Sequence, residues 1–529
     1  MAVNWTREQK QVIEGREKSL LVSAAAGSGK TAVLVERIIQ MITEGENPKD
    51  IDRLLVMTFT RAAAAEMRER IQAAIEKKLE SEPENEHLQQ QAVLVQFAQI
   101  TTIDSFCLHI MREHFDRLDI DPAFRVGDEG EMLLMRADVM DGLLEDYYRD
   151  GGKRYEEFVD AYATGKADGG IAEYVMQVYN FAQSNPWPDA WYEKCREELL
   201  LTEQGELEQT EWMQFLLRDI ALQAQEWKIQ LREAWEICQE TGGPMPYLPM
   251  IEEDLRHAEA VCGAADSFET ISEALEQFTF SRLAAIRGKN GEVDPEKKAL
   301  VSDCRSRVKK AVEKLKGEYL FAFPEQMLAD MEAGKERILE LLELAQEFGR
   351  RFRAKKKEKN VVDFHDLEHF ALEILTEPEA ECSEAEETSS AEETDQMQGK
   401  NAWTVRVPGT VADELAVQYD EILVDEYQDS NLVQETLIQC ISGERFDRPN
   451  VFMVGDVKQS IYKFRLARPE LFLEKYSTYT SEESAHQKIE LHQNFRSRDH
   501  ILESINAIFY RIMTEKLGNI SYTEDAALH

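Results

Sequence analysis

The sequence predicts an α/β fold in which a parallel sheet domain is split by a large, mainly α-helical insertion. Three observations support this fold class. Short apolar runs alternate with helical stretches over the first 120 residues, as they do in parallel sheets. Residues 121–359 carry long charged stretches with helical periodicity. Strand-like runs return from residue 421 onwards, so the two ends of the chain are expected to build one sheet domain around the insertion.

The expected elements follow in chain order. Strands are predicted at residues 20–22, 54–59, 99–103, 421–424, 451–454 and 488–491, and helices at 32–41, 212–240, 331–353 and 501–516. The predicted domains are 1–120 and 360–500 for the two parts of the sheet domain, 121–359 for the insertion, and 501–529 for the start of a further domain. Residues 376–400 hold nine acids, one lysine and almost nothing to bury, so they are predicted to form a disordered surface loop.

Composition bounds the function. The 529 residues are 43% hydrophobic and 31% charged, which is typical of a globular protein. No apolar stretch approaches 18 residues and the N-terminus does not resemble a signal peptide, so membrane insertion and secretion are not expected. The seven cysteines never form C-x-x-C, so neither a disulfide framework nor a zinc site is indicated, and a reducing cytoplasm fits best.

The net charge of −41 argues, taken alone, against a nucleic-acid partner, because neutralising phosphates needs clustered lysine and arginine. The acids are segregated, however. Residues 376–400 carry much of the excess, whereas eight bases face seven acids in residues 451–500. The overall charge therefore does not rule out DNA binding.

A phosphate-binding loop is predicted at residues 24–31 (AAAGSGKT), between a strand and an amphipathic helix. In such a loop the backbone N–H groups surround the phosphates of ATP. Lys30 would reach the β- and γ-phosphates, and the Thr31 hydroxyl would hold Mg²⁺. The alternative is a glycine-rich turn without a ligand. The predicted nucleotide-binding residues here are Ala24, where the common pattern has glycine, and Ala25, Ala26, Gly27, Ser28, Gly29, Lys30 and Thr31.

A second acidic motif is expected to complete this site. The apolar run 421–424 ends in Asp425 and Glu426. Asp425 can take Mg²⁺ while Glu426 polarises the attacking water. The alternative interpretation is an acidic turn after a strand. The presence of a phosphate-binding loop in the same chain favours the metal-binding interpretation over it.

Six segments together resemble the UvrD/Rep-type superfamily-one DNA helicases. They are residues 24–31, 58–67 (TFTRAAAAEM), 102–107, 419–429, 455–465 and 491–497, and they occur in the family's order. The resemblance implies a P-loop RecA-like domain, ATP and Mg²⁺ as cofactors, and 3′-to-5′ DNA helicase activity. It also implies that Gln9 recognises adenine, and that Gln459 and Arg496, an arginine finger, read the γ-phosphate.

The same resemblance implies a path for single-stranded DNA. Aromatic side chains would stack on bases, which tolerates any base sequence. Phe59 and Phe106 could instead be core residues. Arg61 stands where the family usually has asparagine, which leaves its contact with DNA open. The predicted DNA-contacting residues are Thr58, Phe59, Thr60, Thr102, Ser105, Tyr462, Phe464 and Arg465.

Within that family the chain most resembles the AddA type, the helicase–nuclease subunit of bacterial complexes that repair double-strand breaks. Residues 361–367, 458–462 and 464–472 carry this likeness. It implies recombinational repair, single-stranded and duplex DNA as partners, and a second, AddB-type subunit. The family's later motifs and the nuclease domain are absent, so the chain is expected to be an N-terminal fragment that ends in a truncated second RecA-like domain.

Two functional hypotheses stay open. One is an ATP-driven helicase motor. The other is a truncated module that binds ATP and single strands without motor activity. The basic run at residues 350–359 also has two interpretations, a guide for duplex DNA or a solvated helix end.

Overall fold

All six predicted strands pair into one sheet. They are β1 (Ser19–Ala24), β2 (Leu54–Thr58), β3 (Ile100–Thr102), β8 (Glu421–Asp425), β9 (Val451–Gly455) and β10 (His486–Leu491). The order across the sheet is β10-β1-β9-β8-β2-β3, and every neighbouring pair is parallel. The predicted α/β class with a parallel sheet is therefore confirmed. The computed structural model describes residues 4–45, 48–163, 169–199, 208–264, 266–286, 293–320, 324–378, 406–514, 522–523 and 526–529.

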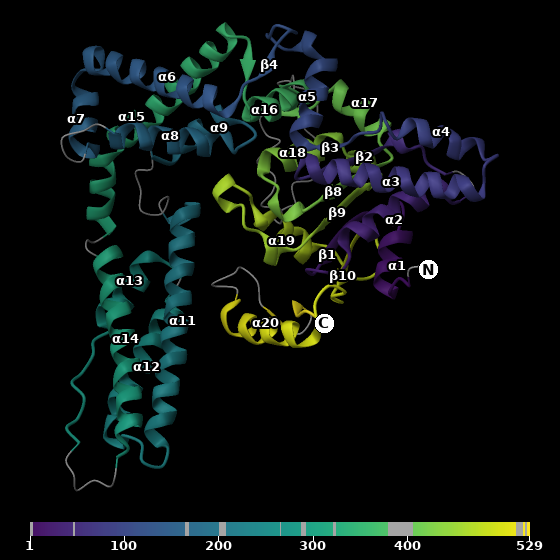
Figure 1. The fold of residues 1–529 in the computed structure, drawn as a ribbon. Coiled ribbons are helices and arrows are strands. Elements are labelled where there is room, and N and C mark those ends of the chain that lie inside the picture. The colour runs from purple at the N-terminus through teal and green to yellow at the C-terminus, as the bar shows by residue number, and fades with distance from the viewer. Residues whose placement is uncertain are drawn as a thin grey trace, which may run out of the picture. The chain divides into compact units, whose positions relative to one another are not determined.

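Helices cover both faces of this sheet, which is why its four central strands, β1, β9, β8 and β2, are largely apolar and buried. Alternate strand residues enter opposite cores: Leu21 and Met57 pack on one face, and Leu20 and Val56 on the other. The first face is covered by α5 (Ile103–Glu113), α16 (Phe364–Leu375), α17 (Thr410–Gln418), α18 (Leu432–Ile441) and α19 (Pro469–Thr478). The second is covered by α1 (Arg7–Glu14), α2 (Lys30–Thr43) and α3 (Arg61–Ser81) (Figure 1).

The chain divides into two compact units. The first comprises Met1–Gly152, Tyr162–Tyr192 and Leu342–His529, and the second comprises Lys153–Ala161 and Glu193–Leu341. All regular secondary structure in the described residues of the second unit is helical. Its main core lies between α11 (Glu211–Gln239), α12 (Leu248–Gly263), α13 (Phe268–Gln277) and α14 (Pro295–Tyr319). Parts of the predicted insertion belong to the first unit by their contacts, and the predicted domain boundaries stay predictions.

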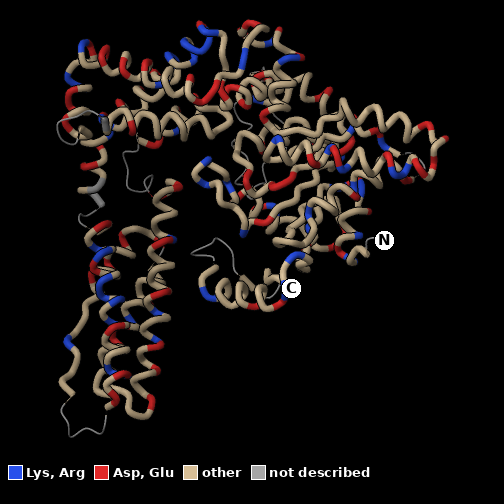
Figure 2. Tube along the Cα trace, viewed as in Figure 1, with Lys and Arg blue, Asp and Glu red and all other residues tan. Residues whose placement is uncertain are grey.

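The remaining elements complete the chain. They are α4 (Glu86–Leu94), β4 (Arg125–Val126), α6 (Glu129–Asp150), α7 (Gly152–Tyr162), α8 (Gly169–Gln183), α9 (Pro188–Leu199), α15 (Pro324–Glu358), β5 (Val361–Val362), β6 (Thr376–Pro378), β7 (Arg406–Pro408) and α20 (Asp499–Ile512). Acidic and basic positions are interspersed along the helices of both units (Figure 2). In the part of the chain that the structure describes, no helix combines the length and the apolar composition that a bilayer crossing requires.

The prediction of a disordered loop at 376–400 is wrong for its first three residues. Thr376–Pro378 forms β6, which pairs antiparallel with β7. Arg406 fixes the pair, because its guanidinium donates to the Thr376 hydroxyl at 2.9 Å and to the Thr376 carbonyl at 2.6 Å. A partner thirty residues away was not visible in the local acidic composition. Residues 379–400 lie outside the described residues.

The basic run at residues 350–359 fits neither of its predicted interpretations fully. It forms the end of α15, and there Phe352 is fully buried and Lys356 is only 4% exposed. Lys356 pairs with Asp363 at 3.1 Å and with Asp366 at 2.6 Å. Although burial alone would raise the pKa of Asp363, the Lys356 charge helps to hold it at about 2. Part of the run is thus a buried ionic connection between α15 and α16.

Candidate nucleotide and DNA site

Five predicted motif segments follow or end a strand of the one sheet at its carboxyl end, as does the acid pair, whereas Gln9 lies on α1, before β1. The phosphate-binding loop follows β1, the acid pair ends β8, and the segments with Gln459 and Arg496 follow β9 and β10. The segments with Phe59 and Thr102 follow or end β2 and β3. Because all six strands are parallel, these loops meet along one edge, which is where open α/β sheets bind ligands. The predicted nucleotide residues on this edge follow or end β10, β1, β9 and β8, and the predicted DNA contacts follow or end β2, β3 and β9.

The loop after β1 has the backbone that a phosphate cradle needs. Gly27 and Gly29 adopt positive φ angles of 77° and 84°, which side chains disfavour. Gly29 is the N-cap of α2 and makes no side-chain cap bond, so the first N–H groups of that helix lack a side-chain acceptor. The Ser28 hydroxyl is buried and has no hydrogen-bond partner among the described residues. Ala24 is the last residue of β1 and is fully buried, so its methyl group packs in the core.

Lys30 and the acid pair converge although 395 positions separate Lys30 from Asp425. Lys30 Nζ lies 3.0 Å from Glu426 Oε2. Burial, together with the charge of Glu426, raises the pKa of Asp425 to about 6, and Lys30 opposes that shift. Glu426 has a positive φ of 53°, a backbone conformation that is uncommon for a residue with a side chain. Within the described residues no three histidine, cysteine or acidic side chains converge as a metal site, and Mg²⁺ typically takes only one or two carboxylates beside substrate phosphates.

Gln9 stands beside the phosphate-binding loop, where an adenine would be read. It is the third residue of α1 and completes a capping box with Thr6. Its side-chain amide also donates to the Ser28 carbonyl at 3.0 Å. A cavity of about 280 Å³ opens here, lined by Thr6, Glu8, Gln9, Ser28, Leu491, His492, Gln493, Phe495 and His529. The loops that follow β1 and β10 therefore meet at a cavity close to the size range of small-molecule sites.

Gln459 and Arg496, the predicted γ-phosphate sensors, differ in how firmly they are held. The Gln459 side chain donates to Asp456 Oδ2 at 2.8 Å and is half-buried. Arg496 is exposed, and its backbone N–H donates to Asn494 Oδ1 at 2.8 Å. Among the described residues its guanidinium has no hydrogen-bond partner, whereas the Gln459 amide is already held by Asp456.

The predicted DNA-stacking residues form an aromatic cluster. The ring centroids of Phe59 and Tyr462 lie 4.7 Å apart, and those of Tyr462 and Phe464 lie 5.8 Å apart. The guanidinium of Arg465 lies 5.5 Å from the centroid of the Tyr462 ring. Phe464 is 76% exposed, so one end of the cluster offers a free stacking face. Phe106 is fully buried and belongs to the core.

The predicted hydroxyl contacts to DNA already have local bonds. Thr58 is 2% exposed and donates to the Thr60 carbonyl at 3.0 Å. Thr60 caps α3 by accepting from the Ala63 N–H, and Thr102 caps α5 by accepting from the Ser105 N–H. The Thr60 and Thr102 hydroxyls therefore fix the starts of α3 and α5. Their contacts with DNA stay predictions.

Comparison with known proteins agrees with this geometry. Residues 5–480 match the UvrD/REP helicase N-terminal domain. The chain belongs to the UvrD/REP helicase family. Three similar curated proteins, each described as the A subunit of an ATP-dependent helicase/nuclease, come from Lachnoclostridium phytofermentans, Clostridium beijerinckii and Bacillus licheniformis. They are 44%, 41% and 41% identical over 99% of this chain and over 37%, 40% and 41% of their own lengths. The chain thus spans about two-fifths of the length of these relatives.

Three further side chains belong to the site of this UvrD/REP chain. Asn494 donates to the Ala26 carbonyl at 2.6 Å, and Gln428 accepts from the Asp456 N–H at 3.0 Å and donates to Glu426 at 2.9 Å. Asp429 is 8% exposed, and burial with the Glu426 charge raises its pKa to about 6. All three stand inside segments that carried the family resemblance, but no residue spacing indicated these cross-loop bonds.

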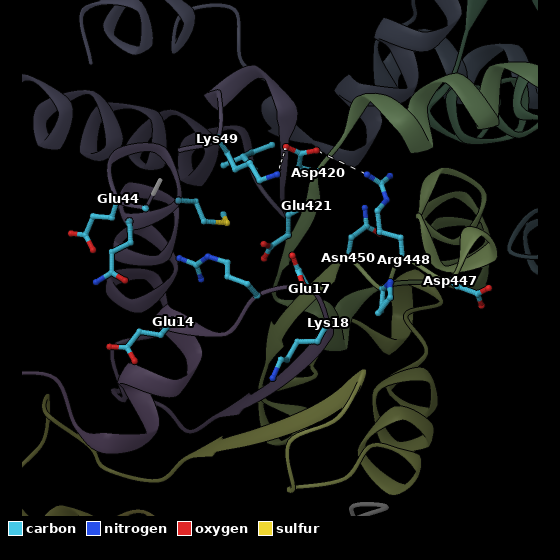
Figure 3. Close-up of a pocket in the computed structure, with 16 residues that line it drawn as sticks. Glu14, Glu17, Lys18, Glu44, Lys49, Asp420, Glu421, Asp447, Arg448 and Asn450 are labelled. Carbon is cyan, nitrogen blue, oxygen red and sulfur yellow. Dashed lines mark ion pairs between the residues drawn. The ribbon is translucent and has the colours of Figure 1, made fainter. Parts of the chain in front are cut away.

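A second cavity, of about 700 Å³, opens at the opposite edge of the same sheet (Figure 3). Its lining includes Glu421 at the start of β8 and Glu44 just after α2, whereas Lys30 begins α2 about 20 Å away along the helix. Its basic side chains are engaged: Arg16 by the Ile13 carbonyl, Lys18 by Glu483, Lys49 by Asp420 and Arg448 by the Ala416 carbonyl. This cavity therefore does not resemble a phosphate site.

Proposed function

We propose that this chain is the ATP-hydrolysing motor part of a 3′-to-5′ DNA helicase. The observation that carries the proposal is the 3.0 Å pair between Lys30 and Glu426, next to Asp425, on the same sheet edge as the aromatic cluster. An ATPase site and a stacking platform on one edge are what a strand-translocating motor requires.

The residues divide the ATPase work as follows. Thr31 and Asp425 would hold Mg²⁺, which neutralises phosphate charge when bound. The orphaned Ser28 hydroxyl and the first N–H groups of α2, which lack a side-chain cap, fit a bound triphosphate. When ATP binds, Lys30 would pair with the phosphates in place of Glu426. Glu426 would then be able to polarise the attacking water.

Translocation would depend on the short segment that joins Gln459, the γ-phosphate sensor, to the aromatic cluster. Gln459 precedes Tyr462 by three residues and Phe464 by five. A displacement of Gln459 when the γ-phosphate leaves would therefore reach the stacking faces through one short segment. Arg496 would complete the site from the β10 side.

The wider biological role follows the curated relatives. Because they are described as one subunit of a helicase/nuclease, they support a place in double-strand-break repair by recombination. The partners would be single-stranded and duplex DNA, together with a second subunit of the AddB type. The second candidate, an ATP- and strand-binding module without motor activity, is favoured by the exposed side chain of Arg496.

Phosphate release with and without oligo(dT) tests the proposal. The chain should hydrolyse ATP faster with DNA. Lys30→Ala should lose nucleotide binding, and Glu426→Gln should bind Mg-ATP while turnover falls about 10²–10⁴-fold. Lys77→Ala, an exposed lysine on α3, serves as the matched control. Binding of both ligands without turnover would select the binding module, and no nucleotide binding by the unmodified chain would refute both.

A further inference from the structure

One buried carboxylate connects the nucleotide half of the sheet edge to the DNA half. Glu368 lies on α16, directly after the 361–367 segment, and is 5% exposed. Helix α16 packs against α5 on one side and α18 on the other (Figure 1). Glu368 makes no ion pair among the described residues, so a buried acid here requires another source of stabilisation.

That stabilisation comes from the start of α18. Gln434 donates to Glu368 Oε1 at 2.7 Å, and Asn431 donates to Oε2 at 3.5 Å. Asn431 and Gln434 also form the capping box of α18 with each other. Glu368 therefore holds both residues that define where α18 begins, at the positive end of the helix dipole.

The start of α18 is continuous with the loop that carries the acid pair. Only Tyr427–Asp429 and Ser430 separate Glu426 from Asn431. Two backbone bonds stiffen this connection: the Asp429 N–H donates to the Glu426 carbonyl at 3.0 Å, and the Ser430 N–H donates to the Tyr427 carbonyl at 3.1 Å. Gln434 also lines a small cavity with Phe59, Asp425 and Glu426. A displacement of the cap would therefore shift both acidic side chains.

On its other side Glu368 faces the first turn of α5. Asp104 stands there between Thr102 and Ser105, and its charge acts on Glu368 across the α5–α16 interface. Burial raises the pKa of Asp104, and the charge of Arg61, an exposed residue at the start of α3 beside Phe59 and Thr60, opposes that shift. A DNA phosphate drawn to Arg61 would weaken its hold on Asp104, and the two neighbouring carboxyls would respond.

We propose that Glu368 is a positioning residue through which strand binding at the β2–β3 side alters the acid-pair loop after β8. The inference rests on the proposed function and adds to it the route of DNA stimulation. Glu368 touches neither ATP nor DNA; it transmits the effect through the Asn431–Gln434 cap.

The experiment measures how each ligand changes the affinity for the other. Oligo(dT) binding by the whole chain is followed by fluorescence anisotropy with and without a non-hydrolysable Mg-ATP analogue, at a temperature where circular dichroism shows each variant folded. The unmodified chain should change its oligo(dT) Kd at least about fivefold on nucleotide binding, a typical coupling. Glu368→Gln should reduce that factor below about twofold while both ligands still bind. Glu373→Gln, an exposed acid on the same helix, should retain the full factor.

A pH series on the unmodified chain keeps the inference testable even if Glu368→Gln fails to fold. Burial, with the Asp104 charge, raises the pKa of Glu368 to about 7, and the Gln434 and Asn431 bonds oppose that shift. The other titratable groups that interact with it are Asp104 and Cys107 on α5. Only the ionised carboxylate accepts both cap bonds fully. The factor by which the nucleotide changes the oligo(dT) Kd should therefore rise at least about twofold between pH 6.5 and 8.5. In Glu368→Gln this factor should not change with pH.

The outcomes separate the two proposals. No nucleotide binding by the unmodified chain would overturn the proposed function and this inference together. If both ligands bind, an equal coupling factor in the unmodified chain and in Glu368→Gln, or a factor that does not change with pH, would overturn the inference alone.

Discussion

The buried ion pair between Arg37 and Glu421 connects α2 to β8, the two elements that carry Lys30 and Asp425. Arg37 lies on α2, seven residues after Lys30, and Glu421 begins β8, four residues before Asp425. Arg37 Nε lies 2.7 Å from Glu421 Oε1, and Arg37 Nη1 donates to the Val12 carbonyl at 2.5 Å. The arginine is fully buried. The pair therefore fixes the helix that carries Lys30 against the strand that carries the acid pair.

Arg37→Met should destabilise the sheet unit by about 3–5 kcal/mol, because it leaves the 8% exposed Glu421 as an uncompensated charge. Glu421→Gln should lower the unfolding free energy by a similar amount, because it leaves the buried Arg37 without its carboxylate partner. The double variant Arg37→Met/Glu421→Gln removes both charges, so it should cost at least about 2 kcal/mol less than the sum of the single variants. Arg149→Met removes an ion-paired but 67% exposed side chain and should leave the unfolding free energy almost unchanged.

Because the chain has two compact units, the assay must report on the first unit alone. Hydrogen exchange of peptides from α2 and β8, measured by mass spectrometry across a urea series, does so. The same peptides should lose protection together in both single variants and regain most of it in the double variant. Additive single-variant costs, or a cost below about 1 kcal/mol for Arg37→Met, would refute this role of the ion pair.

Three further predictions follow from the site and from α15. Asp425 must be ionised to hold Mg²⁺, and its pKa is raised to about 6. Isothermal titration calorimetry should therefore show the Mg-nucleotide affinity falling about tenfold from pH 8 to pH 5. In Glu426→Gln the midpoint of this fall should lie at lower pH, and an affinity independent of pH would contradict the prediction. Tyr462→Ala should weaken oligo(dT) binding by about 1–3 kcal/mol in anisotropy titrations, and exposed Phe446→Ala should not. Lys356→Met should cost about 3–5 kcal/mol in urea unfolding because Asp363 and Asp366 lose their buried partner, whereas Lys355→Met should cost about 0.5 kcal/mol or less.

The sheet and the positions of its motifs were predictable because both depend on local patterns. The central strands are short apolar runs, and the phosphate-binding loop and the acid pair stand where such runs end. The approach of Lys30 to Glu426 followed from this rule, since parallel strands present their carboxyl ends at one edge. The strand order could not be predicted from these runs, because it depends on which side chains pack across the whole sheet.

The contacts that sequence analysis missed are long-range and polar. Lys356 looked like part of a solvated basic run, yet it continues the buried stripe of Phe348 and Phe352 at a spacing of four residues, which one face of a helix produces. That periodicity, together with the acids of the next segment, could have predicted that Lys356 is buried in an ion pair. The bonds of Glu368 to Asn431 and Gln434 gave none, because amide–carboxylate pairs more than sixty residues apart leave no local pattern.

The sheet order has a consequence for synthesis on the ribosome. Strand β2 lies between β3, which follows it in the chain, and β8, which emerges more than 300 residues after β3. At about 5–20 residues per second, one edge of β2 waits roughly 15–60 s for its neighbour while the helical unit is made. During that interval an apolar strand edge is open to unintended pairing. Nascent chains should therefore engage chaperones until β8 is translated.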